Sequence, residues 1–185
     1  NGVKLSDYQA QGNIPNIYQK YDYNAVYVGA ISQWFDMELL INIALQKSNW
    51  QFTIIGKKPN VVAPSNVLFL GEKKGLDKVP YLQHATVGII PFNNITHRSL
   101  INYVNPIKLY EYLACGIPVI STEWGELKKI NAPIRLVKNT DEFVACLSEL
   151  EKQKIPKAPL LEFALKFDWE AITERLLTEL KYEKH

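Results

Sequence analysis

The 185-residue chain has few of the residues that form disulfide frameworks or metal centres. It contains two cysteines, Cys115 and Cys146, both within apolar helical patterns, and three histidines that form no cluster. Neither residue type has the spacing of a metal site, so no metal ion is expected. We expect the cysteines to be buried thiols in a reducing compartment. A chain of this length can bury enough surface to fold without disulfides or metal.

The sequence also lacks long apolar runs and an excess of one charge. No run approaches the roughly 18 residues of a membrane-spanning helix, and no signal peptide is recognisable. The 21 basic and 19 acidic residues leave too small an excess to indicate a nucleic-acid-binding surface. No G-x-G-x-x-G motif follows the first predicted strand, which argues against a nicotinamide site. We therefore expect a cytoplasmic protein with no nucleic-acid partner.

From residue 25 onward, short β-rich runs alternate with helical patterns. Several of the runs are almost continuously apolar, which is typical of strands buried on both faces of a parallel sheet. This pattern predicts an α/β fold with an open, doubly wound, mainly parallel six-stranded sheet and helices on both faces. The predicted strands are 25–29, 51–55, 67–70, 86–90, 118–121 and 134–137. The predicted helices are 37–47, 76–84, 106–115, 124–130, 141–152 and 160–182, the last with a break near 167–168.

Three parts of the chain differ in composition. Residues 1–24 are polar and tyrosine-rich, and we expect a linker or lead-in segment with little regular structure. Residues 25–166 form the predicted sheet domain, and residues 167–185 form a C-terminal helix expected to pack back on it. Because the chain begins at Asn1 without an initiator methionine, we expect it to be part of a longer protein.

The segment 105–120, NPIKLYEYLACGIPVI, has clear helix boundaries. Asn105 is predicted to be the N-cap and Pro106 the first helical residue. Gly116 suits the left-handed residue after the helix, and Pro118 prevents its continuation.

Lys108 and Glu111 are three residues apart, so they share one face near the start of this helix. Free N–H groups of the first turn together with a lysine can bind phosphate. A carboxylate one turn later can accept hydrogen bonds from the two hydroxyls of a ribose. Judged by spacing alone, a surface Lys–Glu pair without a ligand explains these two residues as well.

Eight residues of this segment, in order and spacing, resemble the donor-binding signature of GT-B glycosyltransferases, in the large group with a glycogen-synthase-like C-terminal half. The resemblance covers about residues 25–140, including the segments 28–36, 52–56, 79–82 and 89–92. Weaker matches lie at both ends, in residues 1–3 and in residues 168–169 with the final helix. The eight residues are Pro106, Lys108, Glu111, Ala114, Gly116, Pro118, Val119 and Ile120.

The resemblance implies that the chain is one Rossmann-like half of a GT-B enzyme. This half would bind a nucleoside-diphosphate sugar, and an N-terminal domain of the same protein would bind the acceptor. The implied reaction is transfer of a hexosyl-type group to a hydroxyl, without an essential metal or other cofactor. The implied setting is bacterial polysaccharide or glycoconjugate synthesis in the cytoplasm, with peripheral association of the full-length protein at the inner face of the membrane. The isolated chain is expected to be inactive.

The resemblance also implies roles for single residues. Lys108 and Glu111 are the expected catalytic residues: Lys108 would stabilise the departing diphosphate, and Glu111 would hold the ribose hydroxyls. The other implied donor-binding residues are Gly29, Ile31, Gly56, Tyr81, Pro91, Asn105, Pro106 and Ile107.

Two departures from the family pattern leave alternatives open. Tyr103 stands where many members have a glutamate near the donor sugar, which leaves open whether the reaction retains or inverts the anomeric configuration. The basic pair after the first strand is replaced by residues 31–34, where Trp34 can either pack or stack on a ligand. A nucleotide-sugar 2-epimerase-like enzyme and a non-catalytic nucleotide-binding or assembly module are the alternative functions.

Overall fold

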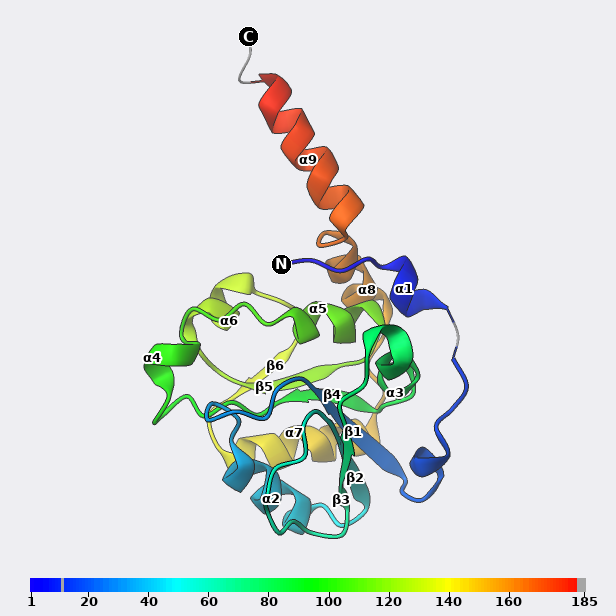
Figure 1. Cartoon of the computed structure of the whole chain (residues 1–185), viewed down its shortest axis with the longest axis vertical. Helices are drawn as coiled ribbons and strands as arrows, with labels where there is room; N and C mark the ends of the chain where they lie inside the picture. Colours follow the sequence, from blue (N-terminus) through cyan, green and yellow to red (C-terminus); the bar gives the residue numbers. More distant parts are fainter. Residues whose placement is uncertain (11, 183–185) are drawn as a thin grey trace.

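All six strands run parallel in one sheet, and helices cover both of its faces (Figure 1). The computed structural model describes residues 1–10 and 12–182. The strand order β3-β2-β1-β4-β5-β6 reverses between β1 and β4, and open α/β sheets bind ligands at such a reversal. The predicted doubly wound α/β fold is therefore confirmed. The strands are β1 (Tyr23–Val28), β2 (Trp50–Ile55), β3 (Val67–Gly71), β4 (Val87–Ile90), β5 (Val119–Thr122) and β6 (Arg135–Val137).

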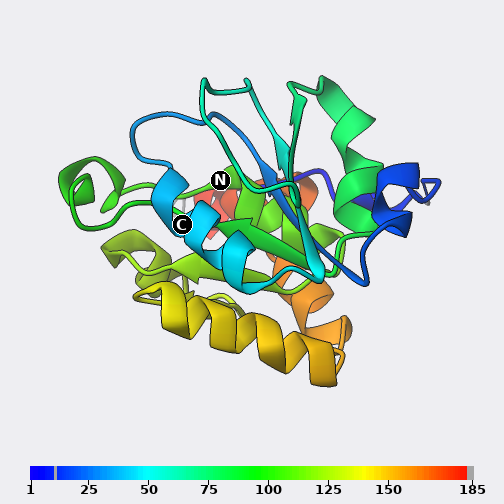
Figure 2. The same cartoon turned by 90° about the horizontal axis from the view of Figure 1, so that it is seen from below.

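Two layers of helices bury the sheet. Helices α2 (Met37–Gln46) and α7 (Thr140–Lys152) lie side by side on one face (Figure 2). Each begins at a predictable cap, because Asp36 and Asn139 accept hydrogen bonds at 2.9 Å from the backbone N–H three residues later. The opposite face carries α3 (Val79–Gln83), α5 (Ile107–Ala114), α6 (Gly125–Ile130) and α8 (Ala158–Leu165). The 3₁₀ helix η2 (Gly75–Lys78) precedes α3, and the unpredicted α4 (Arg98–Ile101) precedes α5.

Close packing joins α5 to the centre of the sheet. The Tyr112 ring lies over Gly88 of β4, where a Cβ atom would overlap it. Its hydroxyl accepts a hydrogen bond from the Val28 backbone N–H at 2.9 Å, at the end of β1 where pairing with β4 has stopped. The buried contact fixes α5 against the carboxyl end of β1.

The N-terminal segment has more structure than the linker that we expected. It contains α1 (Ser6–Gln9) and the 3₁₀ helix η1 (Asn16–Gln19), and it buries Tyr8 and Tyr18 against the domain. Val3 pairs with the C-terminal part of the chain, through backbone hydrogen bonds to Phe167 and Trp169. The boundaries of this segment as a separate unit stay a prediction.

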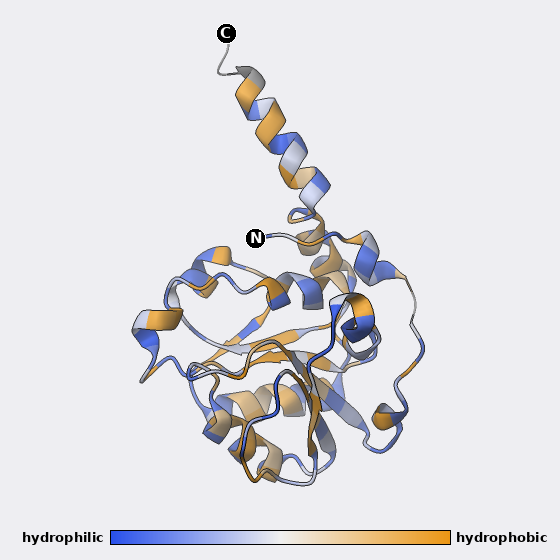
Figure 3. Ribbon diagram, viewed as in Figure 1, coloured by the Kyte–Doolittle hydropathy of each residue, from blue (hydrophilic) through white to orange (hydrophobic). Residues whose placement is uncertain are grey.

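The C-terminal helix also differs from expectation. The predicted break is present between α8 and α9 (Trp169–Tyr182), but α9 extends away from the domain (Figure 1). Leu176, Leu177 and Leu180 are more than half exposed, and Figure 3 shows apolar turns along the part of α9 that extends away from the domain. The expected packing on the domain is corrected for the exposed leucines of α9, whereas its first turn, with Trp169 and Ile172, lies against Gly2. The boundary of this helix as a separate unit stays a prediction. Residues 183–185 of that prediction lie outside the described part.

Among the described residues, none of the helices has the length and apolar character that crossing a lipid bilayer requires.

Candidate functional site

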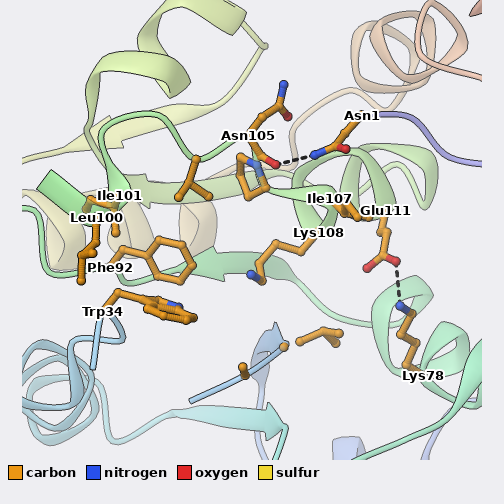
Figure 4. Close-up of a pocket in the computed structure, with 15 residues that line it drawn as sticks. Asn1, Trp34, Lys78, Phe92, Leu100, Ile101, Asn105, Ile107, Lys108 and Glu111 are labelled. Carbon is orange, nitrogen blue, oxygen red and sulfur yellow. Dashed lines mark hydrogen bonds and ion pairs between the residues drawn. The ribbon is translucent and has the colours of Figure 1, made fainter. Parts of the chain in front are cut away.

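A cavity of about 580 Å³ opens at the carboxyl ends of β1 and β4, beside the start of α5 (Figure 4). This is the edge of the sheet where the strand order predicts a ligand. Residues from five parts of the chain line it, including the N-terminal residue Asn1 and Lys78 of η2. The sequence-predicted site residues in the cavity are Gly29, Asn105, Pro106, Ile107, Lys108 and Glu111.

The first turn of α5 faces this cavity with free backbone donors. Pro106, not Asn105, is the N-cap residue, so the predicted helix start was wrong by one position. The Asn105 side chain instead accepts a hydrogen bond from the Tyr110 hydroxyl at 2.9 Å, so it is not available as a cap. Within the described residues, no group accepts a hydrogen bond from the backbone N–H of Ile107 or Lys108. These N–H groups, with the positive end of the helix dipole, favour an anion.

The Lys108 side chain lies between two aromatic rings at the cavity wall. Its Nζ is 5.1 Å from the centre of the Tyr27 ring and 4.9 Å from that of Phe92, which favours the charged amine. Burial opposes this effect and lowers the pKa of Lys108 to about 8, although Glu111 raises it. The cavity wall therefore carries a buried amine whose positive charge is supported by two aromatic rings and by Glu111.

Gly29 makes room for this lysine. A Cβ atom at residue 29 would lie 3.1 Å from Cε and 3.2 Å from Nζ of Lys108. The backbone φ of +137° is also one that side chains with a Cβ rarely adopt. The turn after β1 thus needs glycine both for its conformation and for the space it leaves.

Glu111 is buried, with 6% of its surface exposed, but its surroundings are polar. Oε1 accepts hydrogen bonds from Lys78 Nζ at 2.6 Å and from the Tyr8 hydroxyl at 2.9 Å. The ion pair of Glu111 is therefore with Lys78, and both its partners come from elsewhere in the sequence. A surface pair with Lys108 is excluded.

The opposite end of the cavity is apolar. Trp34, Phe92, Leu100 and Ile101 line this end, while Glu111, Asn1 and Lys78 lie at the other end, with Lys108 between them (Figure 4). Trp34 was not among the predicted site residues. Its neighbour Phe35 is buried in the core against Tyr27, so of these two aromatic residues only Trp34 lines the cavity. A ligand in this cavity meets charged groups at one end and aromatic or aliphatic faces at the other.

Four predicted donor-binding residues lie outside this cavity. Gly56 lines a neighbouring hollow of about 280 Å³, which also contains Lys73 and Lys74. Ile31 packs beside Gly56. The Tyr81 carbonyl oxygen accepts a hydrogen bond from the Tyr18 hydroxyl, and the Pro91 carbonyl oxygen accepts one from the Asp36 backbone N–H. Ile31, Tyr81 and Pro91 line neither of these two cavities.

Two polar residues around Glu111 had no signal in the sequence. Tyr8 lies in the segment that we expected to be a linker, and Lys78 belongs to a lysine-rich stretch typical of an exposed surface. Only the fold brings them together, from 103 and 33 residues away. Tyr103, the residue in place of a glutamate, is 77% exposed and lines neither cavity.

No group of three His, Cys, Asp or Glu side chains in the described part of the chain could hold a metal ion.

Comparison with known proteins supports the same family as the motif. Residues 22–153 match the family model for the group 1 glycosyl transferases. A protein of Bacillus subtilis (strain 168) that is named as a teichuronic acid biosynthesis glycosyltransferase, TuaH, is 26% identical over 115 residues, which cover 58% of this chain and 28% of TuaH.

Solved structures share the fold. Sucrose-phosphate synthase from Thermosynechococcus elongatus aligns with a TM-score of 0.73 and 19% identity, over 100% of this chain and 52% of the synthase. HepE from Anabaena, solved in complex with UDP-glucose, aligns with a TM-score of 0.72 and 14% identity, over 98% and 56%. The C-terminal domain of the group 1 glycosyl transferase LpcC from Francisella tularensis aligns with a TM-score of 0.61 and 14% identity, over 95% and 98%.

The chain spans 28% of TuaH and about half of the two larger structures, and nearly all of the isolated C-terminal domain. The match of the family model covers well over half of the sequence. The chain therefore belongs to the group 1 glycosyl transferases and has the fold of the C-terminal-type domain of a GT-B enzyme.

Proposed function

We propose that this chain is the half of a glycosyltransferase that binds a nucleoside-diphosphate sugar. One observation carries the proposal: Lys108, the free N–H groups of α5 and Glu111 line the same cavity, at the edge of the sheet where ligands bind. The cation and the helix terminus suit a diphosphate, and the carboxylate suits the hydroxyls of a ribose. A nucleoside diphosphate contains both groups.

Lys108 would act on the departing diphosphate. Cleavage of the bond between sugar and phosphate leaves negative charge on the diphosphate oxygens. A preorganised ammonium and two backbone N–H groups stabilise that charge more strongly in a site from which water is excluded. Glu111 would orient the nucleoside and take no part in bond cleavage.

The rest of the proposed reaction depends on a second domain. An N-terminal half of the full-length protein would bind a hydroxyl-bearing acceptor, so that the sugar is transferred across a cleft. HepE, solved with UDP-glucose, supports a sugar nucleotide as donor, and TuaH supports a role in bacterial polysaccharide synthesis. Within that role we propose a cytoplasmic protein that associates peripherally with the inner face of the membrane. No metal is required in this proposal, since the lysine and the helix supply the positive charge.

Neither alternative function gains support. A nucleotide-sugar 2-epimerase needs acid and base groups beside the sugar, whereas the described residues at the end of the cavity beyond Lys108 are apolar. A non-catalytic module would bind nucleotide but leave the full-length protein without transfer activity, which product analysis with a sugar nucleotide measures directly.

Calorimetric titration of the 185-residue chain tests donor binding. UDP, GDP, ADP and CDP, and their common sugar derivatives, are titrated in turn, and saturable binding of at least one is expected. Lys108→Ala should weaken the tightest binder by about tenfold or more, because a charge-assisted contact is lost. Lys58→Ala, which removes an exposed lysine, serves as the matched control and should have no effect. The absence of saturable binding by any of these ligands would refute the proposal.

A further inference from the structure

The Glu111 carboxylate is held from one side only. Both of its hydrogen bonds, from Lys78 Nζ and from the Tyr8 hydroxyl, are accepted by the same oxygen, Oε1. Within the described part of the chain, Oε2 has no hydrogen-bond partner. Glu111 lines the cavity, and Figure 4 shows Lys78 approaching the carboxylate from the side away from Lys108. One oxygen is thus engaged by the protein, and the other is free.

The Tyr8 hydroxyl keeps its proton and so remains a hydrogen-bond donor to Glu111. The Tyr8 side chain is buried, and burial together with the Glu111 charge raises the pKa of the hydroxyl far above the neutral range. The segment that carries Tyr8 is tied to α3, because the Gln83 amide donates to the carbonyl oxygens of Tyr8 at 2.8 Å and Ala10 at 2.6 Å. The hydroxyl therefore reaches Glu111 from a fixed backbone.

Lys78 approaches the same oxygen from η2. The side chains of Lys78 and Glu111 are 18% and 8% exposed, so water competes weakly for this ion pair. A carboxylate oxygen has two lone pairs in its plane, and the ammonium and the phenol together use those of Oε1. The carboxylate can then neither rotate freely nor offer Oε1 to a ligand.

We propose that Tyr8 and Lys78 are positioning residues, which hold Glu111 by Oε1 so that Oε2 accepts the hydroxyl groups of a ribose. The inference rests on the proposed function, and it assigns to the N-terminal segment a part in selecting the nucleoside. A carboxylate held in one orientation favours a ribose over a sugar without hydroxyls. The same carboxylate without its supports would lose that preference, although Lys108 would still bind the diphosphate.

The test measures a ratio of affinities. The nucleoside diphosphate that binds the 185-residue chain most tightly and its 2′,3′-dideoxy analogue are titrated into each variant by calorimetry. We expect the wild-type chain to prefer the ribose form by about tenfold, since hydrogen bonds to a charged acceptor are lost in the analogue. Tyr8→Phe and Lys78→Gln should each lower this preference to about threefold or less. Glu111→Gln should lower it at least as far.

Matched variants separate positioning from general damage. Tyr18→Phe removes another buried tyrosine hydroxyl with a 2.9 Å hydrogen bond, and Lys47→Gln breaks the ion pair with Glu151. Both should leave the preference unchanged. Lys108→Ala should weaken both ligands equally and leave their ratio intact. Circular dichroism checks that each variant is folded. Tyr8→Phe keeps the ring, so the affinity ratio can be measured in this variant even if Lys78→Gln does not fold.

The outcomes distinguish the two proposals. If Glu111→Gln abolishes the ribose preference while Tyr8→Phe and Lys78→Gln retain all of it, the positioning role is overturned and donor binding stands. A stronger preference in Lys78→Gln would also overturn it, because Lys78 would then compete with the ribose. If no nucleoside diphosphate binds the wild-type chain, the proposed function fails, and the positioning role fails with it.

Discussion

Lys108 is a buried amine whose protonation should control anion binding. Its pKa is lowered to about 8 by burial, whereas a bound diphosphate would stabilise the charged form and raise it. Binding then takes up a proton above pH 8, so the affinity falls as the pH rises through about 8, by up to about tenfold per pH unit. Calorimetry with a nucleoside diphosphate between pH 7 and 9.5 measures this decline. Lys108→Arg, which stays charged, should remove it.

A side chain at residue 29 should reduce both the stability of the protein and its affinity for a diphosphate. Gly29→Ala places a methyl group against the Lys108 amine and imposes an unfavourable φ, at a cost of about 1–3 kcal/mol in the free energy of unfolding. It should also weaken diphosphate binding, because Lys108 must move.

Gly75→Ala provides a matched control for Gly29→Ala. Gly75 also has a positive φ, of +49°, but no atom lies within 4 Å of its added Cβ. Urea unfolding should show strain in both variants, whereas titration should show loss of affinity only in Gly29→Ala. Equal losses of affinity would mean that contact with Lys108 is unimportant.

At the residue scale, local spacing correctly placed Lys108 and Glu111 close together on one helix, and the structure places both at the cavity. Their roles in binding a donor stay a prediction. The partners of Glu111 could not be predicted, since hydrogen bonds across 103 and 33 residues leave no periodic pattern. The cap of α5 was misplaced because Tyr110, five residues later, engages the Asn105 side chain.

Tyr112 couples helix α5 to strand β1, so its hydroxyl should matter for stability. Tyr112→Phe keeps the ring over Gly88 but leaves the Val28 backbone N–H buried without an acceptor. The free energy of unfolding should fall by about 1–3 kcal/mol. Urea denaturation measures the loss, and Tyr23→Phe, which removes a longer and weaker bond of 3.3 Å, should cost less. A change in Tyr112→Phe below that of Tyr23→Phe would contradict this account.

Strands and long helices followed closely from apolar periodicity, because strands buried on both faces leave continuous apolar runs. The four-residue helix α4 was missed, since a single turn in a polar loop has no repeating pattern to detect. The two short helices before β1 were missed for the same reason. The packing of α9 was mispredicted because an amphipathic stripe indicates that a helix has an apolar face and does not specify what covers it.

At the scale of the whole molecule, α9 should contribute little to the stability of this domain. Deletion of residues 176–185 removes the exposed leucines, and the free energy of unfolding should change by less than about 0.5 kcal/mol. Deletion of residues 167–185 also removes the hydrogen bonds of Val3 to Phe167 and Trp169, so it should destabilise the domain measurably. Urea unfolding compares the two. A large effect of the shorter deletion would show that α9 packs on the domain.

The hydrogen bond between Tyr8 and Glu111 joins the first residues of the chain to the helix that would hold the nucleotide. Linked equilibria are reciprocal: if the bond prepares the carboxylate for a ligand, the ligand must strengthen the bond by the same free energy. Amide hydrogens of residues 5–8 should therefore exchange with deuterium more slowly when a nucleoside diphosphate is present, and Tyr8→Phe should reduce that protection. The segment that carries Tyr8 would thus register occupancy of the cavity through the buried carboxylate of Glu111.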